Sequence, residues 1–153
     1  MKNIDIKKLS FYLIITLLIG GLPSVFVIDN NYQSLNKPPL SPPAILFPIV
    51  WTILFIIMGI SIYRIMMTDS KSKNEGRLIY FIQLFVNAFW TPIFFGLNEY
   101  FLAFLWILML IILVISMIFI FYKIDKLSAY LNIPYLIWLL FATYLNFYIF
   151  ILN

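Results

Sequence analysis

The chain has 153 residues, of which 64% are apolar, 20% are aromatic and 10% are charged, and it contains no cysteine and no histidine. A soluble domain averages about 45–50% apolar and about 25% charged residues, so the composition excludes a soluble enzyme and a disordered chain. The lack of cysteine and histidine excludes a disulfide scaffold, thiol catalysis, the common zinc sites and the usual Ser-His-Asp triads. The sequence therefore predicts an integral membrane protein.

Five stretches without a charged residue follow one another along the chain, at residues 9–28, 38–63, 78–98, 100–122 and 127–153. A helix crosses the hydrocarbon core of a bilayer in about 20 residues, so each stretch can cross once. Helices are expected because lipid offers the backbone no hydrogen-bond partner. We predict an all-α integral membrane protein, a five-transmembrane-helix bundle with helices at about 9–28, 44–66, 78–97, 100–122 and 129–151, in a single domain over residues 1–153.

The first stretch also has features of a secretory signal peptide, because Lys7-Lys8 precedes the apolar segment Leu9–Ile19. No small-x-small cleavage site follows this segment, where the chain reads Gly20-Gly21-Leu22-Pro23-Ser24. A retained transmembrane helix is therefore the favoured interpretation.

Two connections between the predicted helices have informative sequences. The loop at residues 37–43 contains four prolines, which cannot continue a helix, so the second helix begins after it. The link Asn98-Glu99 is very short, which predicts that the third and fourth helices form an antiparallel pair.

Basic residues are distributed unevenly between the two ends of the predicted bundle. With five crossings, one side holds Lys2, Lys7, Lys8, Arg64, Lys71, Lys73, Arg77, Lys123 and Lys126, and the other side holds Lys37. Basic residues are retained in the cytoplasm. We therefore predict a cytoplasmic N-terminus and a C-terminus outside, in a bacterial cell membrane.

The predicted spans contain amide and aromatic side chains but no Asp, Glu, Lys or Arg at mid-membrane depth, which argues against a proton pump or a voltage sensor. Three helix faces carry these side chains: Trp51 and Phe55; Gln83, Asn87 and Trp90; and Trp138, Ala142 and Asn146. One interpretation is that the amides are interhelical hydrogen-bond partners, worth about 0.6 kcal/mol each. The other is that they line a pocket under the proline-rich loop, suited to a planar, largely apolar ligand.

Three blocks of sequence resemble the TspO/translocator protein family, which includes the tryptophan-rich sensory proteins and the peripheral benzodiazepine receptors. They are Leu35-Asn36-Lys37-Pro38 with Pro42-Pro43 and Val50-Trp51-Thr52-Ile53-Leu54; residues 83–90 with Phe94-Phe95; and residues 133–138 with residues 141–146. Two tryptophans usual in the family's first loop are replaced, by Asn31 and Leu40.

The resemblance implies a homodimeric five-helix membrane protein that binds protoporphyrin IX, related tetrapyrroles or drug-like aromatic ligands under the first loop. It implies a sensor, scavenger or transporter, with light-dependent porphyrin breakdown in some bacterial relatives, and it implies no required cofactor, no metal and no nucleic-acid partner. Two alternatives stay open: a true porphyrin-degrading enzyme, and a structural membrane protein without a small-molecule ligand.

The resemblance also assigns roles to individual residues by position. The implied ligand-binding residues are Tyr32, Pro42, Trp51, Phe55, Asn87, Trp90, Trp138 and Ala142. Trp51 and Trp138 are the catalytic candidates if porphyrin degradation takes place, because an indole beside an excited porphyrin can donate an electron. Haem iron would find no histidine or cysteine ligand in this chain, so we expect the free-base porphyrin to bind without an axial bond.

Overall fold

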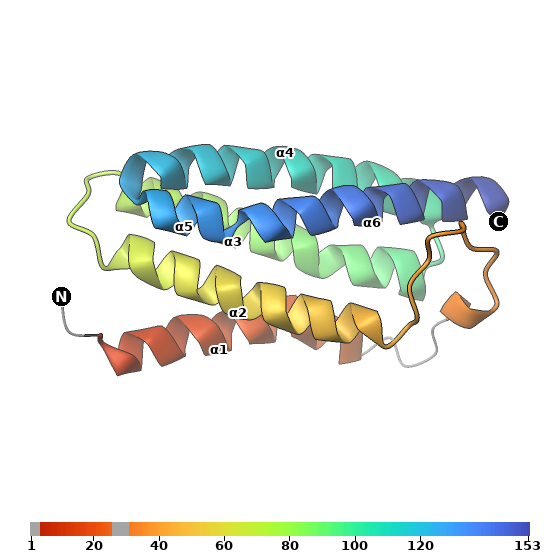
Figure 1. Ribbon diagram of the computed structural model, residues 1–153, viewed down its shortest axis with the longest axis horizontal. Coiled ribbons are helices and arrows are strands. Elements are labelled where there is room, and N and C mark those ends of the chain that lie inside the picture. Colours follow the sequence, from red (N-terminus) through yellow and green to blue (C-terminus); the bar gives the residue numbers. More distant parts are fainter. Residues whose placement is uncertain (1–3, 26–30) are drawn as a thin grey trace.

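The computed structural model describes residues 4–25 and 31–153 and consists of α-helices joined by short connections (Figure 1). The helices are α1 (Ile6–Val25), α2 (Leu46–Met66), α3 (Lys73–Thr91), α4 (Tyr100–Ile124), α5 (Lys126–Leu131) and α6 (Ile133–Leu152). A 3-10 turn, η1 (Asn31–Gln33), lies between α1 and α2, and a π-helical turn, η2 (Pro92–Gly96), extends α3. Five spans are long and apolar enough to cross a membrane, with α5 and α6 together forming the fifth. The predicted all-α bundle with five transmembrane helices is confirmed.

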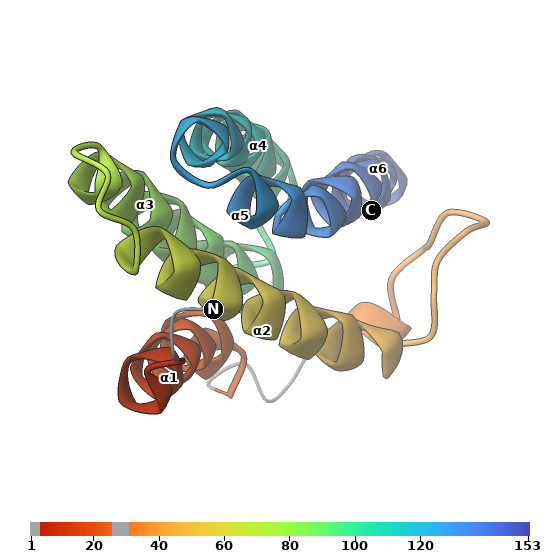
Figure 2. The same ribbon diagram turned by 60° about the vertical axis from the view of Figure 1, so that its left-hand side comes forward.

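The two ends of the bundle differ in what they carry. The N-terminal end of α1 lies beside the α2–α3 and α4–α5 connections, whereas the C-terminus lies beside the α1–α2 loop and the α3–α4 link (Figure 1). Within the bundle, α1 packs against α2 and α3, and α4 packs against α3 and α6. Figure 2 shows that α2 runs away from α6 as it approaches the α1–α2 loop, so the two helices are farthest apart at that end.

Several helix boundaries differ from those predicted, for two physical reasons. α3 begins at Lys73 instead of 78, and α1 at Ile6 instead of 9, because charged residues end an apolar stretch without ending a helix. The fifth span begins at Lys126 instead of 129 and is divided at Asn132, two residues before Pro134. α2 begins at Leu46, two residues later than predicted, and α4 continues to Ile124. The predicted end of the first helix, at 26–28, lies outside the described residues.

The α3–α4 link is as tight as the sequence predicts. η2 ends at Gly96 and α4 begins at Tyr100, and the two helices run antiparallel. Asn98 has a φ of 55°, the left-handed conformation that asparagine tolerates better than most residues. The amide of Leu97 donates to the carbonyl of Pro92 at 2.9 Å, which closes the wide turn that follows this proline.

A polar junction ties α2 to α5 at the end of the bundle opposite the α1–α2 loop. Arg64 donates to both carboxylate oxygens of Asp125, from Nε at 2.8 Å and from Nη2 at 3.0 Å. Asp125 also caps α5 by accepting from the amide of Ser128 at 3.1 Å. Burial raises the pKa of Asp125, but the hydrogen bonds from Arg64 and Ser128 and the charge of Arg64 outweigh it, so the pKa lies below its usual value.

Replacing Asp125 by alanine is expected to lower the stability of the protein by about 1–2 kcal/mol, because α5 loses its cap and Arg64 loses its partner. A lowered carboxylate pKa contributes stability above about pH 4, and this contribution is lost as pH falls through the lowered value. The thermal midpoint of the variant in detergent should therefore lie below that of the wild type at pH 7 and approach it in acid.

The matched control is Glu99→Ala. Glu99 is also an acidic residue at a helix N-cap, but its side chain makes no capping hydrogen bond. Its replacement should leave the thermal midpoint almost unchanged. Equal shifts in the two variants would show that the Asp125 junction adds nothing specific.

Candidate functional site

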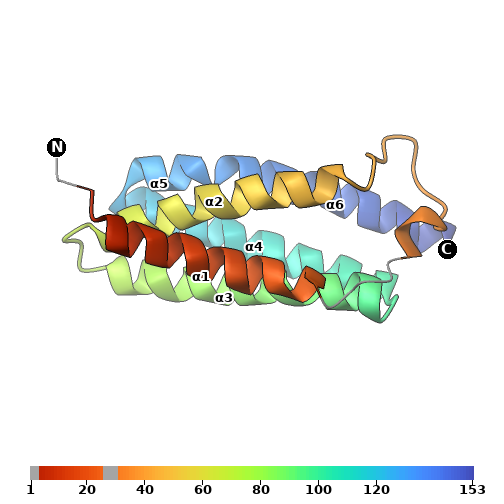
Figure 3. The same cartoon turned by 90° about the horizontal axis from the view of Figure 1, so that it is seen from below.

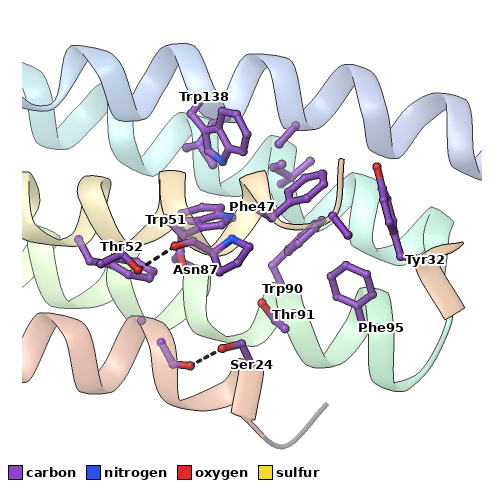
Figure 4. A pocket seen from close by; sticks show the side chains of 18 of the residues that line it. Ser24, Tyr32, Phe47, Trp51, Thr52, Asn87, Trp90, Thr91, Phe95 and Trp138 are labelled. Carbon is purple, nitrogen blue, oxygen red and sulfur yellow. Dashed lines mark hydrogen bonds between the residues drawn. The ribbon is translucent and has the colours of Figure 1, made fainter. Parts of the chain in front are cut away.

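A cavity of about 680 Å³ lies in the half of the bundle nearest the α1–α2 loop (Figure 4). This volume is within the range of about 300–1,000 Å³ typical of small-molecule sites. Its walls come from five helices and from η1, and the principal lining residues are Leu17, Gly20, Gly21, Ser24, Tyr32, Gln33, Ile45, Phe47, Pro48, Trp51, Thr52, Phe55, Asn87, Trp90, Phe95, Trp138 and Ala142. The cavity occupies the region where α2 and α6 diverge.

Seven of the eight residues that the sequence proposed for ligand binding line this single cavity: Tyr32, Trp51, Phe55, Asn87, Trp90, Trp138 and Ala142. The eighth, Pro42, is not part of the lining. Its carbonyl oxygen accepts a hydrogen bond from the hydroxyl of Tyr32 at 3.5 Å, so Pro42 contacts a wall residue without lining the cavity itself. The fold therefore brings together residues that are more than 100 positions apart in the sequence.

Trp51 and Trp138 face the same space from α2 and α6 (Figure 4). The ring of Trp51 stacks on Phe55 with centroids 5.4 Å apart, and Trp138 meets the edge of Phe47 at 6.0 Å. The indole Nε1 of Trp138 is buried and has no hydrogen-bond partner in the described part of the chain. An unmet buried donor costs about 1–3 kcal/mol, so a turn of the indole that brings this atom to the cavity surface would let it donate to a ligand acceptor.

The buried amides divide between the two interpretations that the sequence left open. Asn87 lines the cavity and donates from Nδ2 to the hydroxyl of Tyr135 at 2.8 Å. That hydroxyl donates to Oε1 of Gln83 at 3.0 Å, and Gln83 is fully buried away from the cavity. Asn146 accepts from Nε1 of Trp90 at 3.1 Å. Gln83 and Asn146 therefore connect helices, whereas Asn87 both connects helices and faces the cavity.

The α1–α2 loop covers the end of the cavity with an aromatic side chain. Tyr32 is 5% exposed, and its ring meets the edges of Phe47 at 5.3 Å and Phe95 at 6.4 Å. The same burial raises the pKa of the Tyr32 phenol, which is therefore neutral at physiological pH. Further along the loop, the amide of Asn36 donates to Oδ1 of Asn153 at 3.0 Å, and Nδ2 of Asn153 donates back to the Asn36 carbonyl at 3.0 Å. This pair holds the loop against the end of α6.

No charged side chain is found among the described residues that line the cavity. Its polar groups are amides, hydroxyls and indole N–H groups. Across the described residues there is also no cluster of three or more histidine, cysteine, aspartate or glutamate side chains that could hold a metal. The lining can therefore stack on a flat ligand and form a few hydrogen bonds with it, but it offers no strong acid or base.

The wall contributed by α1 was missed in the sequence. Leu17, Gly20, Gly21 and Ser24 line the cavity, although α1 carries no amide or tryptophan that would suggest a site. Gly20 is required by close packing, because a Cβ atom there would overlap the ring of Phe55. The small residues at 20, 21 and 24 were the available signal.

Comparison with known proteins places the chain among membrane proteins of one family. The model of the TspO/MBR family matches residues 11–152. The chain is 36% identical to the tryptophan-rich protein TspO of Chlorobaculum tepidum, over 99% of each chain. It is 35% identical to protein CrtK of Rhodobacter capsulatus, over 93% of this chain and 90% of the relative. It is 32% identical to the translocator protein of Ovis aries, over 76% of this chain and 70% of the relative.

Gly20→Ala is expected to destabilise the protein by about 1–3 kcal/mol, because its methyl group would displace the Phe55 ring and overpack the wall of the cavity. Gly21→Ala is the matched control: it lies in the same helix and gains the same helix propensity, but a Cβ atom at this position would have no neighbour within 4 Å. Thermal unfolding in detergent should give a lower midpoint for Gly20→Ala only. Equal midpoints would mean that Phe55 can move aside without cost.

Proposed function

The chain belongs to the TspO/MBR family of integral membrane proteins, and we propose that it binds protoporphyrin IX or a related flat tetrapyrrole in this cavity, as a sensor, scavenger or transporter. The observation that carries the proposal is the pair Trp51 and Trp138, which line one uncharged cavity of about 680 Å³ from different helices. The names of its relatives, tryptophan-rich sensory protein and translocator protein, support these roles.

The proposed binding mode uses aromatic faces and a few hydrogen bonds. The macrocycle stacks against Trp51 and Trp138, and a turn of the Trp138 indole lets its buried, unpaired Nε1 donate to a polar atom of the macrocycle. Asn87 supplies an amide on the α3 side, where Tyr135 holds its orientation. Since the chain has no histidine or cysteine for an axial bond, the site favours the free-base porphyrin over haem.

The proposed placement in the membrane follows from the distribution of basic residues. Nine lysines and arginines belong to the N-terminal side, and Lys37 belongs to the other. We propose that the N-terminus is cytoplasmic in a bacterial cell membrane, that the chain forms a homodimer, and that the cavity and its covering loop lie in the outer half of the bilayer.

A porphyrin titration in the dark tests the binding proposal. The detergent-purified protein should give saturable, micromolar quenching of tryptophan fluorescence together with a saturable shift of porphyrin absorption. The absorption shift is needed because replacing tryptophans changes the fluorescence signal itself. The double variant Trp51→Phe/Trp138→Phe should bind at least about tenfold more weakly, since it loses stacking area and the Trp138 donor, together worth about 1.4 kcal/mol or more.

Trp106→Phe is the matched control for this titration. Trp106 lies outside the cavity lining and donates to the carbonyl of Val86 at 2.7 Å. Its replacement should leave porphyrin affinity unchanged. Quenching that never saturates, or affinities that are equal in all the proteins, would mean that the porphyrin partitions into the micelle, and would favour a structural membrane protein without a small-molecule ligand.

If the bound porphyrin is broken down in light, Trp51 and Trp138 are the expected electron donors, because both line the cavity. At saturating porphyrin, the double phenylalanine variant should lose the light-dependent decrease in porphyrin absorption. A decrease equal to that of the wild type would contradict the donor role. Multiple turnovers to one defined product would indicate a porphyrin-degrading enzyme, whereas one equivalent of bleaching with oxidised tryptophan would indicate a photochemical side reaction.

A further inference from the structure

We propose that the ligand enters and leaves this cavity sideways from the bilayer, through a slot between the loop-side halves of α1 and α2. The slot, called here the α1–α2 slot, is formed by Gly21 and Ser24 of α1, by Pro48 and Thr52 of α2, and by Ile45 just before α2. The inference rests on the proposed function and adds to it the chemical class of the ligand: a flat, largely apolar molecule that partitions into lipid and is delivered from the lipid phase.

The exposure of the lining residues locates the mouth of the cavity. Ile45 is 68% exposed, and Ser24, Pro48 and Thr52 are also exposed, although all four line the cavity. The lining residues on the opposite side are buried: Ile107 of α4 is 2% exposed and Leu139 of α6 is fully buried. Residues that line a cavity and also reach the surface mark its opening. Gln33 of η1 and Ala44 just before α2 are exposed lining residues as well, so the mouth extends from the gap between α1 and α2 to the adjoining part of the loop, and the cavity is closed toward α4 and α6.

The opening lies at the level of membrane-spanning helix. Gly21 and Ser24 belong to the apolar span Ile6–Val25, and Pro48 and Thr52 belong to the span Leu46–Met66. Both hydroxyls of the slot are satisfied by their own helices: Ser24 donates to the Gly21 carbonyl at 2.6 Å, and Thr52 to the Pro48 carbonyl at 2.7 Å. The slot therefore presents no unpaired hydroxyl donor to lipid, and an apolar ligand can pass without breaking a hydrogen bond.

The packing of α1 against α2 is tight where the helices cross and loose at the slot. Figure 3 shows α1 and α2 apart beside the α1–α2 loop, and Figure 1 shows them apart at the opposite end, so the helices cross between these ends. Along the contact, a Cβ atom on Gly59 would lie 3.0 Å from the side chain of Leu13, and a Cβ atom on Gly20 would overlap the ring of Phe55. One residue further along α1, nothing lies within 4 Å of a Cβ atom built on Gly21. The loop-side end of α1 therefore leaves room at the slot, beyond Gly20.

Compared with the slot, the route through the α1–α2 loop is obstructed by side chains. Tyr32 fills the end of the cavity between Phe47 and Phe95, and the hydrogen bonds between Asn36 and Asn153 hold the loop in place. Entry from water would require these contacts to break. Entry through the slot requires only lateral displacement of lipid chains.

The cysteine-free chain allows the slot to be blocked selectively after folding. Gly21→Cys places one thiol in open space at the mouth, and a benzyl methanethiosulfonate reagent adds a bulky group to it as a mixed disulfide, which a reductant removes. Gly96→Cys is the matched control, because a Cβ atom there also meets nothing within 4 Å and Gly96 is not part of the lining. Both proteins are reconstituted in lipid nanodiscs, and protoporphyrin IX entry and release are followed by tryptophan fluorescence.

Labelling Gly21→Cys should slow porphyrin entry at least tenfold, and labelling after the porphyrin is bound should slow its release to a similar extent. Reduction should restore both rates, and the labelled Gly96→Cys protein should behave as the wild type. Slowed release is the decisive readout, because a label that merely competes for space inside the cavity would speed release. Unchanged entry, or faster release, would overturn the proposed route.

A second variant tests the loop directly. A disulfide between Asn36→Cys and Asn153→Cys should pin the loop to α6 and leave both porphyrin rates within about twofold of the reduced form. Slowed rates in this protein, with normal rates in labelled Gly21→Cys, would place the entrance at the loop and overturn the slot. If the unmodified protein shows no saturable porphyrin binding at all, the proposed function itself fails; saturable binding by another route overturns the slot alone.

Discussion

The bilayer offers no hydrogen-bond partner, so every polar group inside this bundle must find its partner within the protein. Most do: Trp90 bonds Asn146, Trp106 bonds a backbone carbonyl, and Tyr135 joins Gln83 to Asn87. Among the described residues four buried side-chain atoms lack a partner, on Ser41, Gln83, Asn132 and Trp138, and of these residues only Trp138 lines the cavity. The unpaired Trp138 indole is therefore the one of these four groups that lies in the wall of the proposed site, whereas the other three lie in the surrounding structure.

The same requirement explains why the two ends of the bundle behave differently. At one end, the Arg64–Asp125 pair and the hydrogen bond from Asn132 to Ser61, 2.6 Å long, connect α2 to the α4–α5–α6 side. At the other end, aromatic side chains take the place of direct helix packing, and Phe47 and Trp138 meet edge to face across the separation. A firmly joined end can hold α2 and α6 in fixed directions, so that their divergence creates a cavity without loss of the bundle.

The sequence predicted the bundle well because charge-free length is a direct physical requirement for crossing lipid. It predicted helix ends less well, since Lys73 and Arg77 leave the apolar stretch but remain helical in water. It identified Asn87, Trp51 and Trp138 through their spacing and through resemblance. It could not identify Gly20 and Gly21 as cavity residues, because the span formed by α1 is apolar and gives no polar signal of a site. A glycine contributes to a cavity wall only by lacking a side chain, so its effect depends on what packs against it. For Gly20 that neighbour is Phe55, which lies 35 positions later in the chain.

An uncharged cavity limits the chemistry that the protein itself can perform. The described lining holds no acid, base or metal-binding cluster. In the proposed light-dependent reaction the porphyrin would therefore supply the reactivity, and the protein would supply orientation and oxidisable indoles. A largely apolar ligand that suits such a lining partitions into lipid, so its concentration beside the proposed slot would exceed its concentration in water. Entry through the slot would use that concentration directly. In this proposal, Tyr32 and the Asn36–Asn153 pair at the loop-covered end would serve to retain the bound ligand.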